Sequence, residues 1–196
     1  CLWQVQYFGY NSIKEDAQAR VIGNYVGSPF YLEMRTNQQL GYIVWGGATS
    51  FENSSYFYFI IQSGNHPAEY LSNQTEQFIF TLSDSLQALS DEEFLVIKNA
   101  VIEKIKEKPT NIPEKARKYY ISAFDYDGNF DRDNQLINAV ENLTKEEAVQ
   151  VLSRVLDKES CEKVTIFLYA KEHNVAEDIE STINDINQWK NTRKYE

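Results

Sequence analysis

Arg35 and Tyr42 are the side chains of this sequence whose types and spacing best suit chemistry on a peptide carbonyl group. They lie seven positions apart, at the two ends of the polar segment RTNQQLGY. A guanidinium and a phenol both donate hydrogen bonds, and both suit an oxygen on which negative charge develops. We expect Gln39, Leu40 and Gly41 to set the bend between them, with Gly41 allowing a sharp turn that brings both donors to one cleft. The alternative is structural, because an arginine near a helix C-terminus meets the helix dipole favourably and a tyrosine at a strand start packs at a sheet edge.

The two histidines, His66 and His173, do not form a metal-binding pattern. They lie far apart in the sequence, and neither belongs to an HxxEH or HExxH motif. We expect His66 in a turn and His173 at the surface after a strand. GxSxG, Walker and GxGxxG motifs do not occur, and nothing supports a Cys–His nucleophile pair. The sequence therefore predicts no metal site built from this chain alone.

A charged cluster, FDRDN, is the remaining candidate for chemistry. Its Asp131, Arg132 and Asp133 could be catalytic or could bind a metal. The pattern favours a structural role, in which Asp131 caps a helix and Arg132 pairs with a carboxylate elsewhere in the fold. The acidic run at residues 91–93 is interpreted as a helix N-terminus only.

Composition narrows the class of protein. The chain has 196 residues and a formal net charge of −10, with 42% hydrophobic and 24% charged residues, which indicates one globular domain spanning residues 1–196. No basic stripe is present, so the sequence predicts no nucleic-acid partner. No apolar run approaches the ~20 residues that span a bilayer, so no membrane insertion is expected. The sequence starts with cysteine and shows no signal peptide, and we expect it to be part of a longer polypeptide or a processed product.

The two cysteines, Cys1 and Cys161, lack zinc-finger and CxxC spacing. Each precedes an apolar run that resembles a strand. A disulfide requires the two strand starts to lie side by side, and two unpaired thiols are the other possibility.

Periodicity predicts the elements that position these residues. Alternation over residues 2–10 predicts a strand. Ser12 and Glu15 form a capping-box pattern that opens a helix, which we expect to end at residues 27–29, with a second short helix starting at Pro29. Further strands are expected at residues 42–45, 55–62 and 163–170. Further helices are expected at residues 67–89, 90–105, 113–124, 130–140 and 144–156, with a closing helix near residues 179–186. This order predicts an α+β fold with one mostly antiparallel sheet and helices on one face.

Several segments together resemble one enzyme family. RTNQQLGYIV is similar to the signature of the pitrilysin/insulysin family of zinc metallopeptidases, in the last of their four homologous domains. FIIQS, NFDRDN, LTKEE and KVTIFLYA follow in the same order as in that family. The resemblance covers roughly residues 30–170.

The resemblance implies a function that the residues alone do not. It implies the fold of the processing peptidases and a clam shell of two halves, in which another domain binds zinc through HxxEH and this chain binds none. Arg35 and Tyr42 are then the catalytic positions, which reach across to a peptide substrate beside the metal. The partners are the N-terminal catalytic half and peptide substrates. The location is open: periplasmic or otherwise exported if bacterial, with the cytoplasm as the alternative.

Two other functions are kept open. The first is a non-catalytic scaffold or binding subunit of the same fold, like processing-peptidase partner subunits or respiratory-complex core proteins. The second is an independent α+β binding module without an enzyme context.

Overall fold

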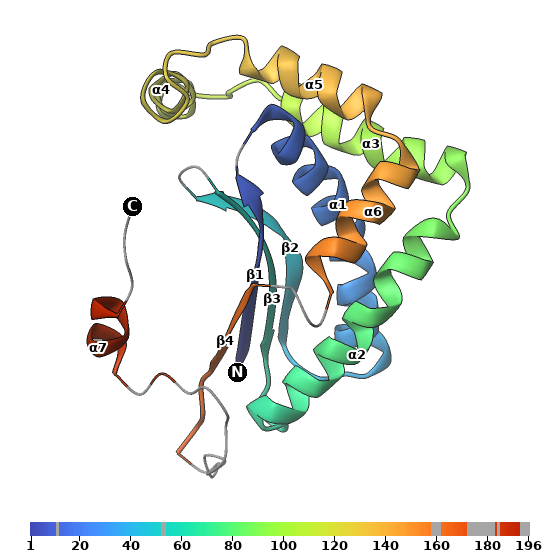
Figure 1. The fold of residues 1–196 in the computed structure, drawn as a ribbon, viewed down its shortest axis with the longest axis vertical. Coiled ribbons are helices and arrows are strands. Elements are labelled where there is room, and N and C mark those ends of the chain that lie inside the picture. Colours follow the sequence, from blue (N-terminus) through green and yellow to red (C-terminus); the bar gives the residue numbers. More distant parts are fainter. Residues whose placement is uncertain (11, 52–53, 158–161, 172–182, 184, 193–196) are drawn as a thin grey trace.

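A four-stranded antiparallel sheet carries helices on one face (Figure 1). The computed structural model describes residues 1–10, 12–51, 54–157, 162–171, 183 and 185–192. All three strand pairs are antiparallel and the strand order is β2-β3-β1-β4, which confirms the predicted α+β class. The strands are β1 (Leu2–Tyr10), β2 (Ile43–Phe51), β3 (Ser54–Gln62) and β4 (Lys163–Phe167).

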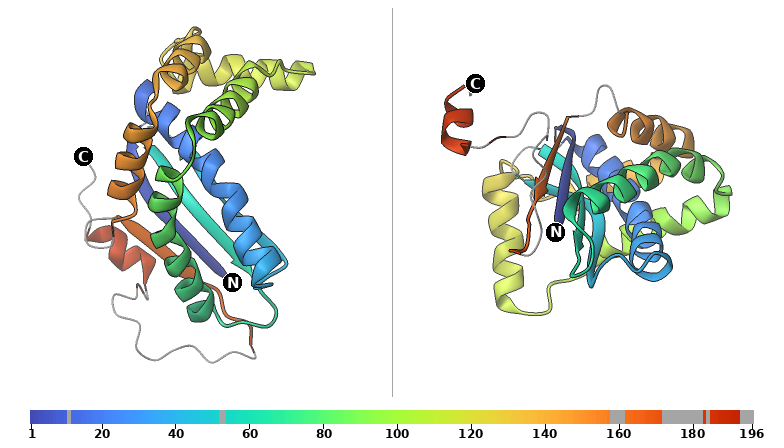
Figure 2. Two further views of the ribbon diagram at one scale, coloured as in Figure 1. Left: turned by 90° about the vertical axis from the view of Figure 1, so that its right-hand side faces the viewer. Right: turned by 90° about the horizontal axis from the view of Figure 1, so that it is seen from below.

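The helices form a layer on the sheet and a second layer behind it (Figure 2). Helix α1 lies against β2 and β3, α2 and α6 lie against β1, and α3 and α5 pack on α1. The predicted start signals are confirmed, since Ser12 caps α1 and capping boxes open α3 and α6. The helices are α1 (Ile13–Tyr31), α2 (Ala68–Gln87), α3 (Asp91–Lys106), α4 (Ile112–Tyr120), α5 (Arg132–Asn142), α6 (Lys145–Val155) and α7 (Ile186–Asn191), with π-helices η1 (Leu32–Asn37) and η2 (Ile121–Asp125).

Helix α1 does not end at residues 27–29, so the predicted break before Pro29 is wrong. The helix passes through Pro29 and continues directly into η1. Proline removes one helical hydrogen bond, which costs ~3 kcal/mol. Val26, Phe30 and Met34 lie on one face at four-residue spacing and are completely or almost completely buried. Burying three such side chains stabilises the helix by more than the proline costs, because each contributes about 1.5–3 kcal/mol.

Strand β1 has the predicted alternation, and its polar residues face the helices. Gln4 and Gln6 are buried there with Leu2 and Phe8, while Trp3 on the other face is 44% exposed. Neither polar atom of the Gln4 side chain has a hydrogen-bond partner in the described part of the chain. The pattern therefore predicted the strand but did not indicate which face the helices cover.

The other sheet face is apolar and carries no packed helix among the described elements (Figure 1). Pairing places Trp45, Ile60, Trp3 and Ile166 in one row across the four strands. Trp45 is 60% exposed. Exposed apolar side chains that adjoin one another in this way are typical of a contact or lining surface.

A buried ion pair joins α5 to α1. Arg132 Nη2 lies 3.0 Å from Asp16 Oδ2, and the other carboxylate oxygen accepts a hydrogen bond from Arg20 Nε at 2.8 Å. The Arg132 guanidinium carbon lies 3.7 Å from the ring centroid of Tyr126. The predicted carboxylate partner of Arg132 is thereby confirmed as Asp16.

Its two neighbours in the FDRDN cluster also have structural contacts. Asp131 stands at the N-cap position of α5 but makes no cap bond with its side chain, which instead accepts a hydrogen bond from Asn134 Nδ2 at 2.6 Å. Asp133 pairs with Lys118. The run at residues 91–93 forms the first turn of α3, as predicted.

Three expectations concern the chain ends and the membrane. The start of β1 lies beside the end of β4, so the starts of these two strands lie at opposite ends of the strand pair. They are not side by side, as a disulfide at the two strand starts requires. Cys161 and His173 lie outside the described residues, as do most of residues 179–186, where a closing helix is predicted. The described helix α7 begins only at Ile186, where the predicted one ends. Among the described helices, none combines the length and hydropathy required to cross a membrane.

We predict that Asp16→Asn destabilises the chain by roughly 2–4 kcal/mol, because it leaves the buried Arg132 guanidinium without its counter-charge. Equilibrium urea unfolding of the purified chain measures this change. Glu103→Gln is the matched control, since it breaks the exposed pair between Glu103 and Lys106 and should cost about 0.5 kcal/mol or less. Equal losses for the two variants would contradict a stabilising role of the buried pair.

Candidate functional site

Arg35 lies on the π-helix η1, which extends α1 by six residues. A π-helical turn is wider than an α-helical one and occurs frequently at functional sites. Met34 is fully buried and anchors this turn in the core, while the neighbouring Arg35 side chain is half-buried. The backbone that carries Arg35 is therefore fixed by packing, and the guanidinium can reach the surface.

The bend after η1 is held by hydrogen bonds to Glu33. The Glu33 carboxylate accepts from Asn37 Nδ2 at 2.7 Å and from Gln38 Nε2 at 2.8 Å, and its carbonyl oxygen accepts from Gln38 N at 2.9 Å. The hydrogen bonds from Gln38 and Asn37 lower the pKa of Glu33. Sequence reasoning missed Glu33, although an acidic residue four positions before Asn37 is a pairing signal on a helix.

Gln39, rather than Gly41, provides the sharp turn. Gln39 has a φ of 54°, in the left-handed region. Leu40 follows, 2% exposed, and its N–H donates to Met34 O at 2.8 Å. The scaffold role predicted for Gln39 and Leu40 agrees with this geometry.

Gly41 is required for a different reason from the predicted one. A Cβ atom at this position would lie 2.4 Å from the carbonyl oxygen of Gln62 on β3. The next residue, Tyr42, donates its N–H to that same oxygen at 2.9 Å. Gly41 therefore permits the close approach of the bend to the sheet. Glycine is required here because it has no side chain, rather than because its backbone is flexible.

The structure brings Arg35 and Tyr42 together at the surface. The Arg35 guanidinium carbon lies 5.8 Å from the Tyr42 ring centroid, which is within the range of a cation–π interaction. Tyr42 is 84% exposed, so its hydroxyl points away from the core. Among the described residues, no carboxylate forms an ion pair with Arg35. The pair thus offers a cation and a phenolic donor to a ligand outside the domain, while the role of each residue stays a prediction.

The other candidates do not assemble into a site. His66 stacks on Tyr70 with ring centroids 5.0 Å apart, at the turn that precedes α2. Within the part of the chain that the structure describes, no three His, Cys, Asp or Glu residues are arranged to hold a metal ion.

Comparison with known families matches residues 21–120 to the family described as PQQ synthase PqqF-like, C-terminal lobe domain 4. The matched segment runs from within α1 to the end of α4 and includes the whole RTNQQLGY bend. It covers just over half of the 196 residues.

Curated and structural relatives agree with this match. The chain is 30% identical to human insulin-degrading enzyme over 149 residues, which is 75% of this chain and 14% of that enzyme. It therefore spans about a seventh of that relative's length. The crystal structure of pitrilysin matches with a TM-score of 0.74 and 23% identity, covering 84% of this chain and 18% of that one. An inactive peptidase domain from Bordetella parapertussis matches with a TM-score of 0.65 and 10% identity, over 88% of this chain and 94% of that one.

The two structural matches show a shared fold, and the family match covers the bend that carries Arg35 and Tyr42. The resemblance drawn from the motifs is thereby confirmed. The chain belongs to the PqqF-like C-terminal lobe domains, the C-terminal domain family of the insulinase/pitrilysin peptidases.

Proposed function

We propose that this chain is the substrate-binding domain of a zinc metalloendopeptidase whose zinc ligands lie in another domain. The observation that carries the proposal is the exposed Arg35–Tyr42 pair, with ring and guanidinium 5.8 Å apart and no competing carboxylate among the described residues. The described residues do not fit a zinc site of their own. The partner in this proposal is the N-terminal half of the same polypeptide, and the ligand is a peptide substrate.

The chemistry of the pair suits peptide hydrolysis. Attack on a peptide bond places negative charge on its carbonyl oxygen, and zinc in the partner domain would polarise that bond. The Arg35 N–H groups and the Tyr42 hydroxyl donate hydrogen bonds to that oxygen or to the neighbouring peptide backbone. Because η1 and the Gly41 contact fix both residues beforehand, little reorganisation is needed when substrate binds.

The aromatic open face of the sheet supports a role inside a larger enclosure. Trp3, Trp45 and Ile166 remain exposed on a face opposite to the helix layer. A chamber wall requires such an arrangement, with helices outside and a sheet inside. An apolar inner surface would favour extended peptides that carry hydrophobic side chains.

A non-catalytic scaffold or binding subunit is the second candidate. The structural match to an inactive peptidase domain, which covers 94% of that chain, favours it specifically. The two candidates differ in one feature, since only a peptidase requires an HxxEH motif in the partner half. Reading the gene upstream of the segment that encodes this chain decides between them.

We predict that Tyr42→Phe in the full-length enzyme lowers kcat about 100-fold, because one donor to the developing oxyanion is lost. The melting temperature should stay unchanged, because the ring and its contact with Arg35 are retained. Tyr10→Phe, an exposed tyrosine on β1 that pairs with the opposite end of β3, is the matched control and should leave turnover unchanged. Unchanged turnover in Tyr42→Phe would reduce Tyr42 to a packing role.

Gly41→Ala tests whether the bend must approach the sheet closely. Its Cβ would meet backbone, so we expect a loss of roughly 1–3 kcal/mol in unfolding free energy, measured by urea denaturation. Gly64→Ala provides the control, because a Cβ there has no atom within 4 Å. If both variants unfold at the same urea concentration, the close contact does not constrain the bend.

Purified alone, the 196-residue chain should neither bind zinc stoichiometrically nor cleave peptides. Metal analysis after dialysis and a fluorogenic peptide assay measure these two properties. Zinc at one equivalent, together with proteolysis that a chelator abolishes, would show that the chain has its own metal site and would refute the proposal.

A further inference from the structure

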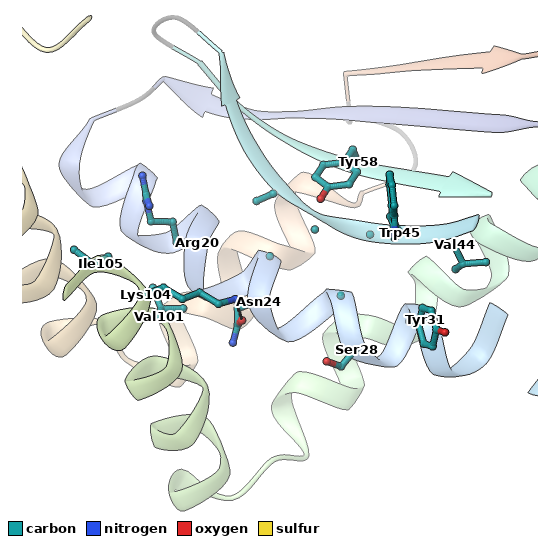
Figure 3. Close-up of a pocket in the computed structure, with 15 residues that line it drawn as sticks. Arg20, Asn24, Ser28, Tyr31, Val44, Trp45, Tyr58, Val101, Lys104 and Ile105 are labelled. Atoms are coloured by element: carbon teal, nitrogen blue, oxygen red, sulfur yellow. Dashed lines mark hydrogen bonds between the residues drawn. The ribbon is translucent and has the colours of Figure 1, made fainter. Parts of the chain in front are cut away.

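A groove follows the free edge of β2 and reaches Arg20, which shares the Asp16 carboxylate with Arg132 of the FDRDN cluster (Figure 3). Its volume is about 460 Å³. Arg20, Asn24, Ser28 and Tyr31 of α1 form one side, Trp45 and Tyr58 lie at the sheet, and Val101, Lys104 and Ile105 of α3 close the far end. The groove is thus bounded by α1, α3 and an edge strand.

Glycines make the groove possible by bringing α1 and β2 into close contact. A Cβ at Gly23 would lie 2.5 Å from the Cβ of Ala48, and one at Gly27 would lie 3.0 Å from the carbonyl oxygen of Gly46. Gly47 continues the lining on the strand. Gly46 and Gly47 put no side chain in front of the β2 backbone where it lines the groove.

Strand β2 lacks the charge, the proline and the short length that protect many edge strands. It is the outer strand of the sheet, so one side of its backbone has no strand partner among the described residues. Its nine residues, IVWGGATSF, contain no charge and no proline. The opposite edge strand, β4, has five residues and begins with Lys163. A long, uncharged edge strand is a template for pairing with another strand.

The charge of the groove is opposite to that of the chain. Its lining contains Arg20 and Lys104 but no carboxylate, whereas the chain has a net charge of −10. Arg20 gives its Nε–H to Asp16, a carboxylate that Arg132 also neutralises. Lys104 Nζ has a neutral partner, Asn24 Oδ1, at 3.0 Å. Lys104 is therefore the cation available to a negatively charged ligand, and Arg20 adds positive charge to the lining while it pairs with Asp16.

We propose that this groove binds an extended acidic peptide segment as an additional strand on β2. Backbone hydrogen bonds to β2 provide the pairing, as in other complexes formed by strand addition. Side chains of an added strand alternate between faces. Its acidic side chains face α3 and contact Lys104 and Arg20, and its apolar side chains lie on the other face beside Trp45. This inference does not rest on the proposed function, since it needs neither zinc nor Arg35 and Tyr42.

A binding assay with a defined peptide tests the proposal. The probe is fluorescein-Gly-Thr-Glu-Val-Glu-Val-Glu-Thr-amide, titrated with the purified 196-residue chain and followed by fluorescence anisotropy. Saturable binding is expected, with backbone amide shifts at Gly46 and Gly47 in heteronuclear NMR spectra. Two control peptides have lysine in place of glutamate, or N-methyl groups on the central amides. Both should bind at least about tenfold more weakly.

Two matched variants distinguish binding in the groove from a general effect of the charge of the chain on peptide affinity. Lys104→Glu reverses a charge in the groove and should weaken binding about tenfold. Lys106→Glu makes the same change on the same helix, at a residue that pairs with Glu103 and does not line the groove, and should change affinity less than about twofold. Both residues are exposed, so both variants should fold.

Three results would overturn the proposal. The first is no binding of the acidic peptide. The second is equal binding of the acidic, basic and N-methylated peptides, which would exclude both charge recognition and strand pairing. The third is a dimer in sedimentation velocity with the β2 amides protected before peptide is added, which would assign the edge to a second copy of the chain. Loss of proteolysis in Tyr42→Phe has no bearing on these outcomes, so this inference and the proposed function fail separately.

Discussion

The close packing of α1 against β2 is the contact on which the other features depend. Gly23 and Gly27 let the helix approach the strand until backbone meets backbone. The same stripe of the helix carries the buried Asp16, seven residues before Gly23, and Asp16 holds α5 through Arg132. Since η1 continues α1 without a break, the position of Arg35 follows from where α1 lies on the sheet. Tyr42 precedes the strand that α1 packs against, so both donors are positioned by one helix–strand contact.

Much of the fold could be predicted because local signals agree with the final contacts. Ser12, Ser90 and Thr144 each precede a helix and cap it, as their spacing to the following glutamates indicates. The predicted strands are present, although β2 extends further than predicted and β4 is shorter. These errors at element ends are expected, because pairing partners decide where a strand stops and they are distant in sequence.

The rest could not be predicted, because tertiary contacts outweighed local preference. Pro29 marks a helix end by its chemistry, but Phe30 packs edge-on against Phe59 and Phe78 and keeps the helix continuous. Gly41 suggests a sharp turn, and only the position of Gln62 reveals that the constraint is steric. For the candidate site, the motif predicted that Arg35 and Tyr42 converge, whereas the carboxylate of Glu33 that orders the bend became visible only in the structure.

The pairing of β4 with β1 has a consequence for how the chain folds. The backbone groups of Cys1 and Leu168 form hydrogen bonds with each other, although the two residues are 167 positions apart in the sequence. All the helices from α1 to α6 lie between them in the sequence. Closing so long a loop is entropically costly, whereas the β2–β3 hairpin and the helices that follow form from neighbouring residues. The sheet should therefore assemble as three strands first and acquire β4 last. During synthesis, the edge of β1 that pairs with β4 would therefore stay unpaired until almost the whole domain has left the ribosome.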